Sequence, residues 1–136
     1  MYETFDHTAD LGLRIRASNL PTLLAEAGRA LFSVIVAGLE TVAPNEIVAI
    51  RVEGEVSELL LFDWLSELLY LYETRRILFT RFDVAVTPEG VTAQAYGEPL
   101  DPARHMLDHE VKAITYHQLK LEQQPDGWLA EVIIDI

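Results

Sequence analysis

The stretch SELLLFDWLSELLYLYET, residues 57–74, decides the fold of this 136-residue chain. Wound as a helix, it is apolar on nearly every side, which is typical of a helix buried in the interior. Ser57 is a suitable N-cap, because its hydroxyl oxygen can accept an unpaired N–H of the first turn. Asp63 and Glu67 interrupt the apolar run, which is also too short to cross a bilayer. We therefore expect a central buried helix here.

A second helix is expected upstream, where apolar residues recur at three- and four-residue spacing between residues 20 and 35. Asn19 is its expected N-cap, and Pro21 fits the first turn because the N–H it lacks would be unpaired there. Gly38 is expected to stop the helix.

The rest of the chain alternates apolar and polar residues in the manner of strands, as at 13–16, 48–53 and 81–86. One dry and one wet face is typical of antiparallel or mixed sheets. Turn sequences occur at 87–90 and 124–127, the second joining a long strand near 111–123 to a closing strand at 128–135.

The resulting order of elements is β-β-α-β-α-β-β-β-β. It predicts one α+β domain over residues 1–136, with two layers: a mixed or mostly antiparallel sheet carrying both helices on one face.

The chain is strongly acidic, with 22 Asp and Glu against 10 Lys and Arg and a net charge of -12. Such a surface repels nucleic-acid phosphates and anionic lipids, so neither strong direct nucleic-acid binding nor membrane binding is expected. It attracts metal ions and basic protein partners instead. The lack of Cys excludes disulfides, thiolate nucleophiles and iron–sulfur clusters. The N-terminus lacks the pattern of a signal peptide, so a cytoplasmic location is expected.

Carboxylates near the two ends of the chain are the main candidate site. Asp10 lies in the turn between the first two strands, where it can simply accept backbone N–H bonds. Asp135 comes directly out of an apolar strand, beside the main-chain carboxylate of Ile136. If the ends meet, three carboxylates converge, and they stay ionised together only with a cation. Oxygen ligands favour Ca²⁺, Mg²⁺ or Mn²⁺.

The four histidines offer weaker candidates. His105 and His109 have the spacing of a zinc site only if they share a helix, which Pro102 makes doubtful. His117 could act as a base, but no Ser or Cys nucleophile stands in a recognisable context, and no glycine-rich phosphate loop occurs. An enzyme acting unaided is poorly supported.

Asp63 and Glu67 lie four residues apart and so share one face of the expected helix. They either form its wet side or serve a partner or the metal site. Lys112 is a scarce cation in this chain, able to pair with one of these acids or to bind an anion. We favour pairing, since structural ion pairs are common.

Four motifs together give the chain a family resemblance: HTADLG at 7–12, LLFDWLSELL at 60–69, KAITYH at 112–117 and the ending VIIDI at 132–136. In this order and approximate spacing they resemble the archease family over essentially the whole chain. Phe62 stands where the family often has a smaller aliphatic residue, a departure that we expect to affect packing only.

The resemblance implies a non-catalytic protein cofactor of the RtcB-type RNA ligase, which joins RNA 3′-phosphate or 2′,3′-cyclic phosphate ends to 5′-hydroxyl ends in tRNA splicing and RNA repair. Archease is thought to promote guanylylation of the ligase's active-site histidine and multiple turnover. Asp10, Asp135 and Ile136 match the family's metal-ligand positions, reported with calcium. Asp63 and Lys112 match motif positions without an assigned ligand role.

Further candidate residues and two alternative functions stay open beside the role in RNA ligation. His7, Asp63, Glu67 and Lys112 are candidates for facing a partner or supporting the site. The alternatives are a metal-stabilised binding module or chaperone-like modulator unrelated to ligation, and a metal-dependent hydrolase using the three carboxylates.

Overall fold

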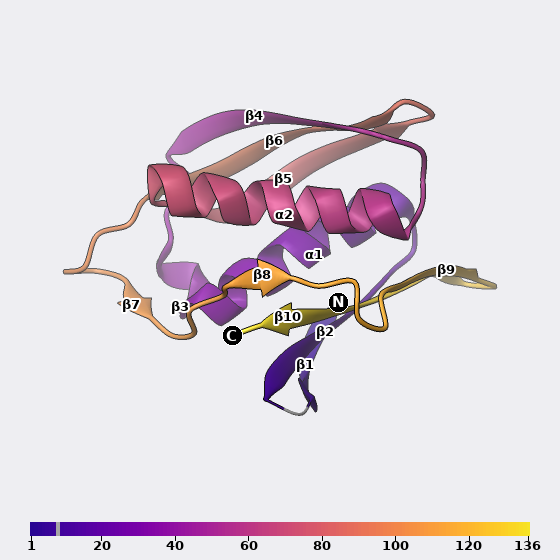
Figure 1. Ribbon diagram of the computed structural model, residues 1–136. Coiled ribbons are helices and arrows are strands. Elements are labelled where there is room, and N and C mark those ends of the chain that lie inside the picture. Colours follow the sequence, from indigo (N-terminus) through magenta and orange to yellow (C-terminus); the bar gives the residue numbers. More distant parts are fainter. Residues whose placement is uncertain (8) are drawn as a thin grey trace.

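In the computed structural model, which describes residues 1–7 and 9–136, two α-helices lie between antiparallel sheets (Figure 1). They are α1, Leu20–Ile35, and α2, Glu58–Arg75. The strands are β1 Tyr2–His7, β2 Asp10–Ala17, β3 Val36–Ala37, β4 Glu46–Glu53, β5 Ile77–Thr87, β6 Gly90–Pro99, β7 Met106–Leu107, β8 Ala113–Ile114, β9 Lys120–Gln124 and β10 Gly127–Asp135, with a short 3₁₀ helix at Leu39–Thr41. No helix in the described ranges is long and apolar enough to span a bilayer.

The strands divide into two main sheets and a small ribbon. One sheet has the order β1-β2-β10-β8, with β9 also paired to β10; the other has the order β4-β6-β5; β3 pairs with β7. Every strand pair formed by the described residues is antiparallel. The predicted α+β class is thus confirmed, whereas the single sheet with both helices on one face is wrong.

The helix predicted to be central and buried, α2, is not the buried one in the structure. α1 contacts β5 of one sheet and β2 of the other, and Phe32 and Leu31 on it are fully buried. α2 keeps an outward side, where Leu59 is 57% and Tyr70 60% exposed. The central buried helix is therefore α1. Gly28 lets the Phe82 ring of β5 approach α1 closely, which periodicity alone does not reveal.

The predicted caps are confirmed, but one helix ends early. The Asn19 side chain accepts the Thr22 N–H at 2.9 Å, and the Ser57 hydroxyl accepts the Leu60 N–H. α1 ends at Ile35, three residues before Gly38, because Val36 and Ala37 pair with β7. Gly38, at φ 76°, opens the 3₁₀ turn instead.

The two predicted turns are confirmed, while the long strand near 111–123 is wrong. Residues 87–90 join β5 to β6, and residues 124–127 join β9 to β10. The long strand is split into β8 and β9 by a turn in which the Leu119 N–H donates to the Tyr116 carbonyl. Gln118 adopts φ 52° there, a conformation incompatible with a continuous strand.

Gly12 is needed for packing rather than for flexibility. It lies in β2 directly opposite Phe5 of β1, and the Phe5 ring occupies the space that a Cβ on Gly12 would fill. The guanidinium of Arg14 lies 4.6 Å from the centroid of the same ring. The ring thus covers the bare backbone of β2 and shields the outer face of the sheet.

Gly12→Ala should lower the free energy of unfolding by about 1–3 kcal/mol, because the new methyl group displaces the Phe5 ring. In a Phe5→Ala background the same change should cost much less. Urea unfolding followed by circular dichroism measures both. An equal loss in the two backgrounds would show that the ring is not the cause.

Candidate functional site

Side chains of β1, β2 and β10 form rows across the sheet face turned away from the helices. Leu13 and Ile15 of β2 are fully buried against the helix side, so alternate residues such as Arg14 face outward. Arg14 pairs in register with Glu3 of β1 and Glu131 of β10. This first row therefore places one cation between two acids.

Arg14 forms an ion pair with each of the two acids of its row. Its Nε lies 2.6 Å from Glu131 Oε2, and its Nη1 lies 3.2 Å from Glu3 Oε1. The hydrogen bonds to Glu131 and then Glu3 raise the pKa of Arg14 above its ordinary value. The row shows how this sheet balances facing carboxylates.

Asp10 and Asp135 belong to the last row on the same face, four residues along from Arg14 and Glu131. Leu11 pairs with Ile134, so the next residue outward on each strand places Asp10 opposite Asp135. Both are half-buried. Side chains directly opposite on antiparallel strands have Cβ atoms about 4.5–5.5 Å apart. The structure thus brings the two predicted carboxylates together, with Ile136 following next.

This row has no counterpart of Arg14. In the described part of the chain, no Lys or Arg nitrogen lies within 4 Å of either carboxylate. Nor do three His, Asp or Glu side chains gather there closely enough to hold a metal alone. Any cation in this row therefore needs further donors, and the main-chain oxygens of the residue next to Asp135 are one source.

His7 completes the row from β1. It pairs with Asp10, and its Nδ1 lies 3.8 Å from Asp10 Oδ2. This Nδ1 atom is buried and has no hydrogen-bond partner among the described residues. The His7 ring meets that of His117 edge-on, with centroids 5.2 Å apart. Thr8, within the predicted motif, lies outside the described residues.

His117, named above only as a possible base, is a neighbour of this row that the sequence did not place there. It follows β8, and β10 and β2 separate its strand from β1. The only signal for it is its place in the KAITYH motif, which also holds Lys112. The two imidazoles meet across the width of the sheet beside Asp10.

Lys112 and the acids of α2 lie apart, so the expected ion pair is wrong. The Lys112 main-chain N–H donates to the Asp135 carbonyl at 2.8 Å, and Lys112 lines a hollow that Tyr72 also lines. Asp63 and Glu67 line a different hollow, facing Arg51 and Glu53 of β4. The turn of α2 directs these acids toward β4, whereas Lys112 lies on the opposite flank.

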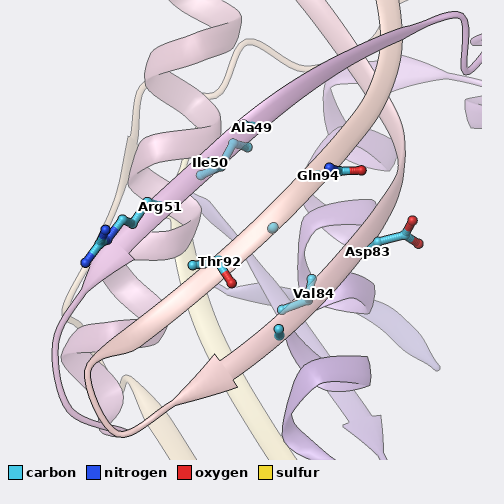
Figure 2. A pocket seen from close by; sticks show the side chains of 9 residues that line it. Ala49, Ile50, Arg51, Asp83, Val84, Thr92 and Gln94 are labelled. Carbon is cyan, nitrogen blue, oxygen red and sulfur yellow. The ribbon is translucent and has the colours of Figure 1, made fainter.

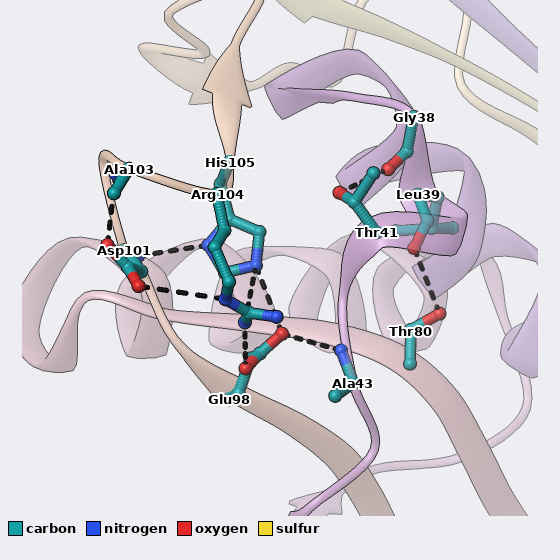
Figure 3. Close-up of polar contacts among 10 residues, drawn as sticks. All are labelled: Gly38, Leu39, Thr41, Ala43, Thr80, Glu98, Asp101, Ala103, Arg104 and His105. Carbon is teal, nitrogen blue, oxygen red and sulfur yellow. Dashed lines mark hydrogen bonds and ion pairs between the residues drawn. The ribbon is translucent and has the colours of Figure 1, made fainter.

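His105 has a structural role (Figure 3). Its Nδ1 accepts the Asp101 N–H at 2.9 Å, so the neutral ring carries its proton on Nε2 and donates to Glu98 Oε2 at 3.0 Å. Glu98 also accepts from the Ala43 N–H and from Arg104. Because both ring nitrogens are engaged and the side chain is buried, a zinc site shared with exposed His109 is excluded.

A hollow on the outer face of the β4-β6-β5 sheet gathers no reactive group (Figure 2). Small side chains such as Ala49 and Thr92 line it, with Arg51 and Asp83 pointing away at opposite sides. Asp83 is already paired with Arg81 and with the Tyr96 hydroxyl. The carboxylate row is thus the candidate site that the fold supports best.

Comparison with known proteins defines the class. The profile of the "Archease protein family (MTH1598/TM1083)" matches residues 2–136, and the chain belongs to this family. It is 41% identical to "Protein archease" of Pyrococcus abyssi, covering 99% of this chain and 98% of the relative. It is 42% identical to "Protein archease" of Methanopyrus kandleri, covering 99% of both.

Solved structures share the fold. Protein 1598 of Methanobacterium thermoautotrophicum has a TM-score of 0.87 at 32% identity, over 99% of this chain and 98% of that one. A Thermotoga maritima protein described as "an archease, possible chaperone" has a TM-score of 0.70 at 22% identity, over 100% of this chain and 98% of that one. At 22% identity the second likeness supports the fold alone.

Glu98 should make the fold sensitive to acid. The hydrogen bond from Arg104 is the main reason that the pKa of Glu98 falls from 4.5 to about 2, although burial of the carboxylate acts in the opposite direction. Because the folded pKa is the lower one, the stabilisation is present above about pH 4.5 and is lost as the pH falls toward 2.

Glu98→Gln should therefore cost about 2 kcal/mol at pH 7, since Arg104 is half exposed and its charge is partly screened. The difference from wild type should shrink from pH 5 to pH 2, measured by urea unfolding at each pH. Glu89→Gln, in an exposed turn, is the control. A difference independent of pH would contradict the assignment.

Proposed function

We propose that the chain is a non-catalytic protein activator of an RtcB-type RNA ligase in the cytoplasm, acting through a divalent cation held by Asp10, Asp135 and the main-chain carboxylate of Ile136. The observation that carries the proposal is the carboxylate row itself. Asp10 and Asp135 face each other on neighbouring strands, and the described residues provide no Lys or Arg between them.

The donor set fits a hard divalent cation. Facing like charges on adjacent strands are destabilising, and Arg14 lowers that cost in the row two steps away. Oxygen donors favour Ca²⁺, Mg²⁺ or Mn²⁺ over zinc or copper, and family resemblance puts calcium first. The buried Nδ1 of His7 is placed to donate a hydrogen bond to Asp10 after a small movement, which would orient the carboxylate toward the cation.

The charge of the chain supports action through another protein. A surface of net charge -12 repels RNA, so a part in RNA joining is best exercised on the enzyme that holds the RNA. The mouth of the ligase active site must be basic to bind RNA and GTP, and the carboxylate row complements it. When bound, the cation would offset charge on the GTP phosphates during guanylylation of the ligase histidine.

A metal-stabilised binding module or chaperone-like modulator is the second candidate. Asp10 begins β2 and Asp135 ends β10, so a shared cation would also tie these strands together without any ligase. Ligase stimulation and the effect of calcium on thermal stability separate these two functions.

Asp10→Asn and Asp135→Asn should abolish stimulation of the ligase, because each removes a cation ligand. The measurement is multiple-turnover guanylylation of the source organism's ligase with labelled GTP and substoichiometric activator. Asp6→Asn is the matched control, since Asp6 makes the same charge change on an exposed, opposite side of β1. Full stimulation by both site variants would rule out the carboxylate mechanism.

Calcium, at a free concentration 100 times the Kd of its site, should raise the melting temperature of wild type by roughly 5–10 °C. Asp10→Asn should lose this rise yet melt no lower than wild type in chelator, because it relieves the repulsion with Asp135. Differential scanning calorimetry tests both signs. Adding residues after Ile136 should weaken the calcium effect. A calcium effect without ligase stimulation would favour the binding module.

A further inference from the structure

The outward side of α2 is uncovered. Figure 1 shows α2 at the front of the molecule with no described element lying over it. Leu59 and Tyr70 stand on this side, three helical turns apart, and are 57% and 60% exposed. Exposed apolar side chains are typical of interaction surfaces where they gather into a patch on an uncovered face.

Tyr116 extends this surface beyond the helix. Its ring stacks on Phe62 of α2 at a centroid distance of 4.0 Å and an angle of 14°, and it is 62% exposed. One face of the ring is therefore covered by Phe62 and the other is open. Phe62 thus does more than fill space: it holds an aromatic ring in a fixed orientation at the surface, as interface anchors require.

Acids flank the apolar surface on both sides. Asp63 and Glu67 lie on the flank toward β4, and Glu73 lies on the flank toward residues 107–112. Within the described residues these three carboxylates make no ion pair, so their charges are free to act on a partner. A second copy of this chain would bring the same acids face to face. Charge complementarity therefore favours a basic partner.

The surface is also next to the carboxylate row. β8 contacts α2 on one side and pairs with β10 on the other, where Ala113 lies opposite Asp135. Tyr116 comes two residues after β8, and His117 contacts His7 of the row. A partner that sits on α2 and extends around the edge strand β8 would thus bring its own residues to the outer face that carries Asp10 and Asp135.

We propose that Leu59, Phe62, Tyr70 and Tyr116, the α2 face, form the docking surface for a protein partner whose contact region is basic and inserts an apolar side chain against Tyr116. The proposal rests on the proposed function in taking the ligase as that partner. Tyr116 supplies the anchor contact, and Asp63, Glu67 and Glu73 steer the Lys and Arg side chains around it.

The test uses isothermal titration calorimetry to measure the Kd between this protein and the purified RtcB-type ligase from the source organism, free of RNA. Tyr116→Ala and Asp63→Lys should each weaken binding about tenfold or more, as truncation of an interface anchor or reversal of a facing charge does. The matched controls are Ile47→Ser, which changes a side chain 59% exposed on β4, and Asp83→Lys, which reverses an exposed charge on the outer face of the β4-β6-β5 sheet. These should change the Kd less than twofold.

The possible outcomes distinguish failure of the α2 face from failure of the proposed function. Wild type that binds and stimulates the ligase, with all four variants binding equally well, overturns the α2 face and leaves the proposed function intact. Wild type that neither binds nor stimulates overturns both. Concentration-dependent dimerisation that Tyr116→Ala abolishes, seen by analytical ultracentrifugation, assigns the face to a second copy and overturns the proposal. Circular dichroism verifies the fold of each variant.

Discussion

The pairing of β2 with β10 is the constraint on which the rest of the structure depends. It joins the beginning of the chain to its end, gives α1 one of its two covers, and sets the register of the outer rows. Ile15 and Ala130, a pair in this register, are both fully buried. A one-residue slip would turn either Leu13 on β2 or Val132 on β10 to the outer face and direct acids of that strand into the core, so burial fixes the register strongly.

The three rows set by this pairing differ in how the side chains facing each other are stabilised. Arg14 pairs with two acids in the first row, and the Phe5 ring covers Gly12 in the second. Asp10 and Asp135 occupy the third with no such compensation from a Lys or Arg in the described residues. Local structure that leaves a cost unbalanced is characteristic of a functional site.

The sequence predicts local structure well and its assembly less well. Asn19, Ser57 and the turn residues are local signals, and each determines a cap or turn through its own backbone geometry. The exposed side of α2 and the separation of Lys112 from Asp63 depend on which sheet lies where, which no local pattern encodes. From the sequence alone, a site at Asp10 and Asp135 depends on the two ends of the chain meeting. The sequence does not show that they meet, because strand order is a property of the whole fold.

The placement of β10 in the interior of its sheet has a consequence for the folding reaction. α2 and the β5–β6 hairpin form from neighbouring residues, but β2 and β10 must close a loop that spans most of the chain. Such non-local closure is slow, so this sheet should be assembled late, with β2 exposing an unpaired edge until then. The row of Asp10 and Asp135 exists only once that step is complete. A chain caught halfway through folding therefore has helices and a hairpin but no site.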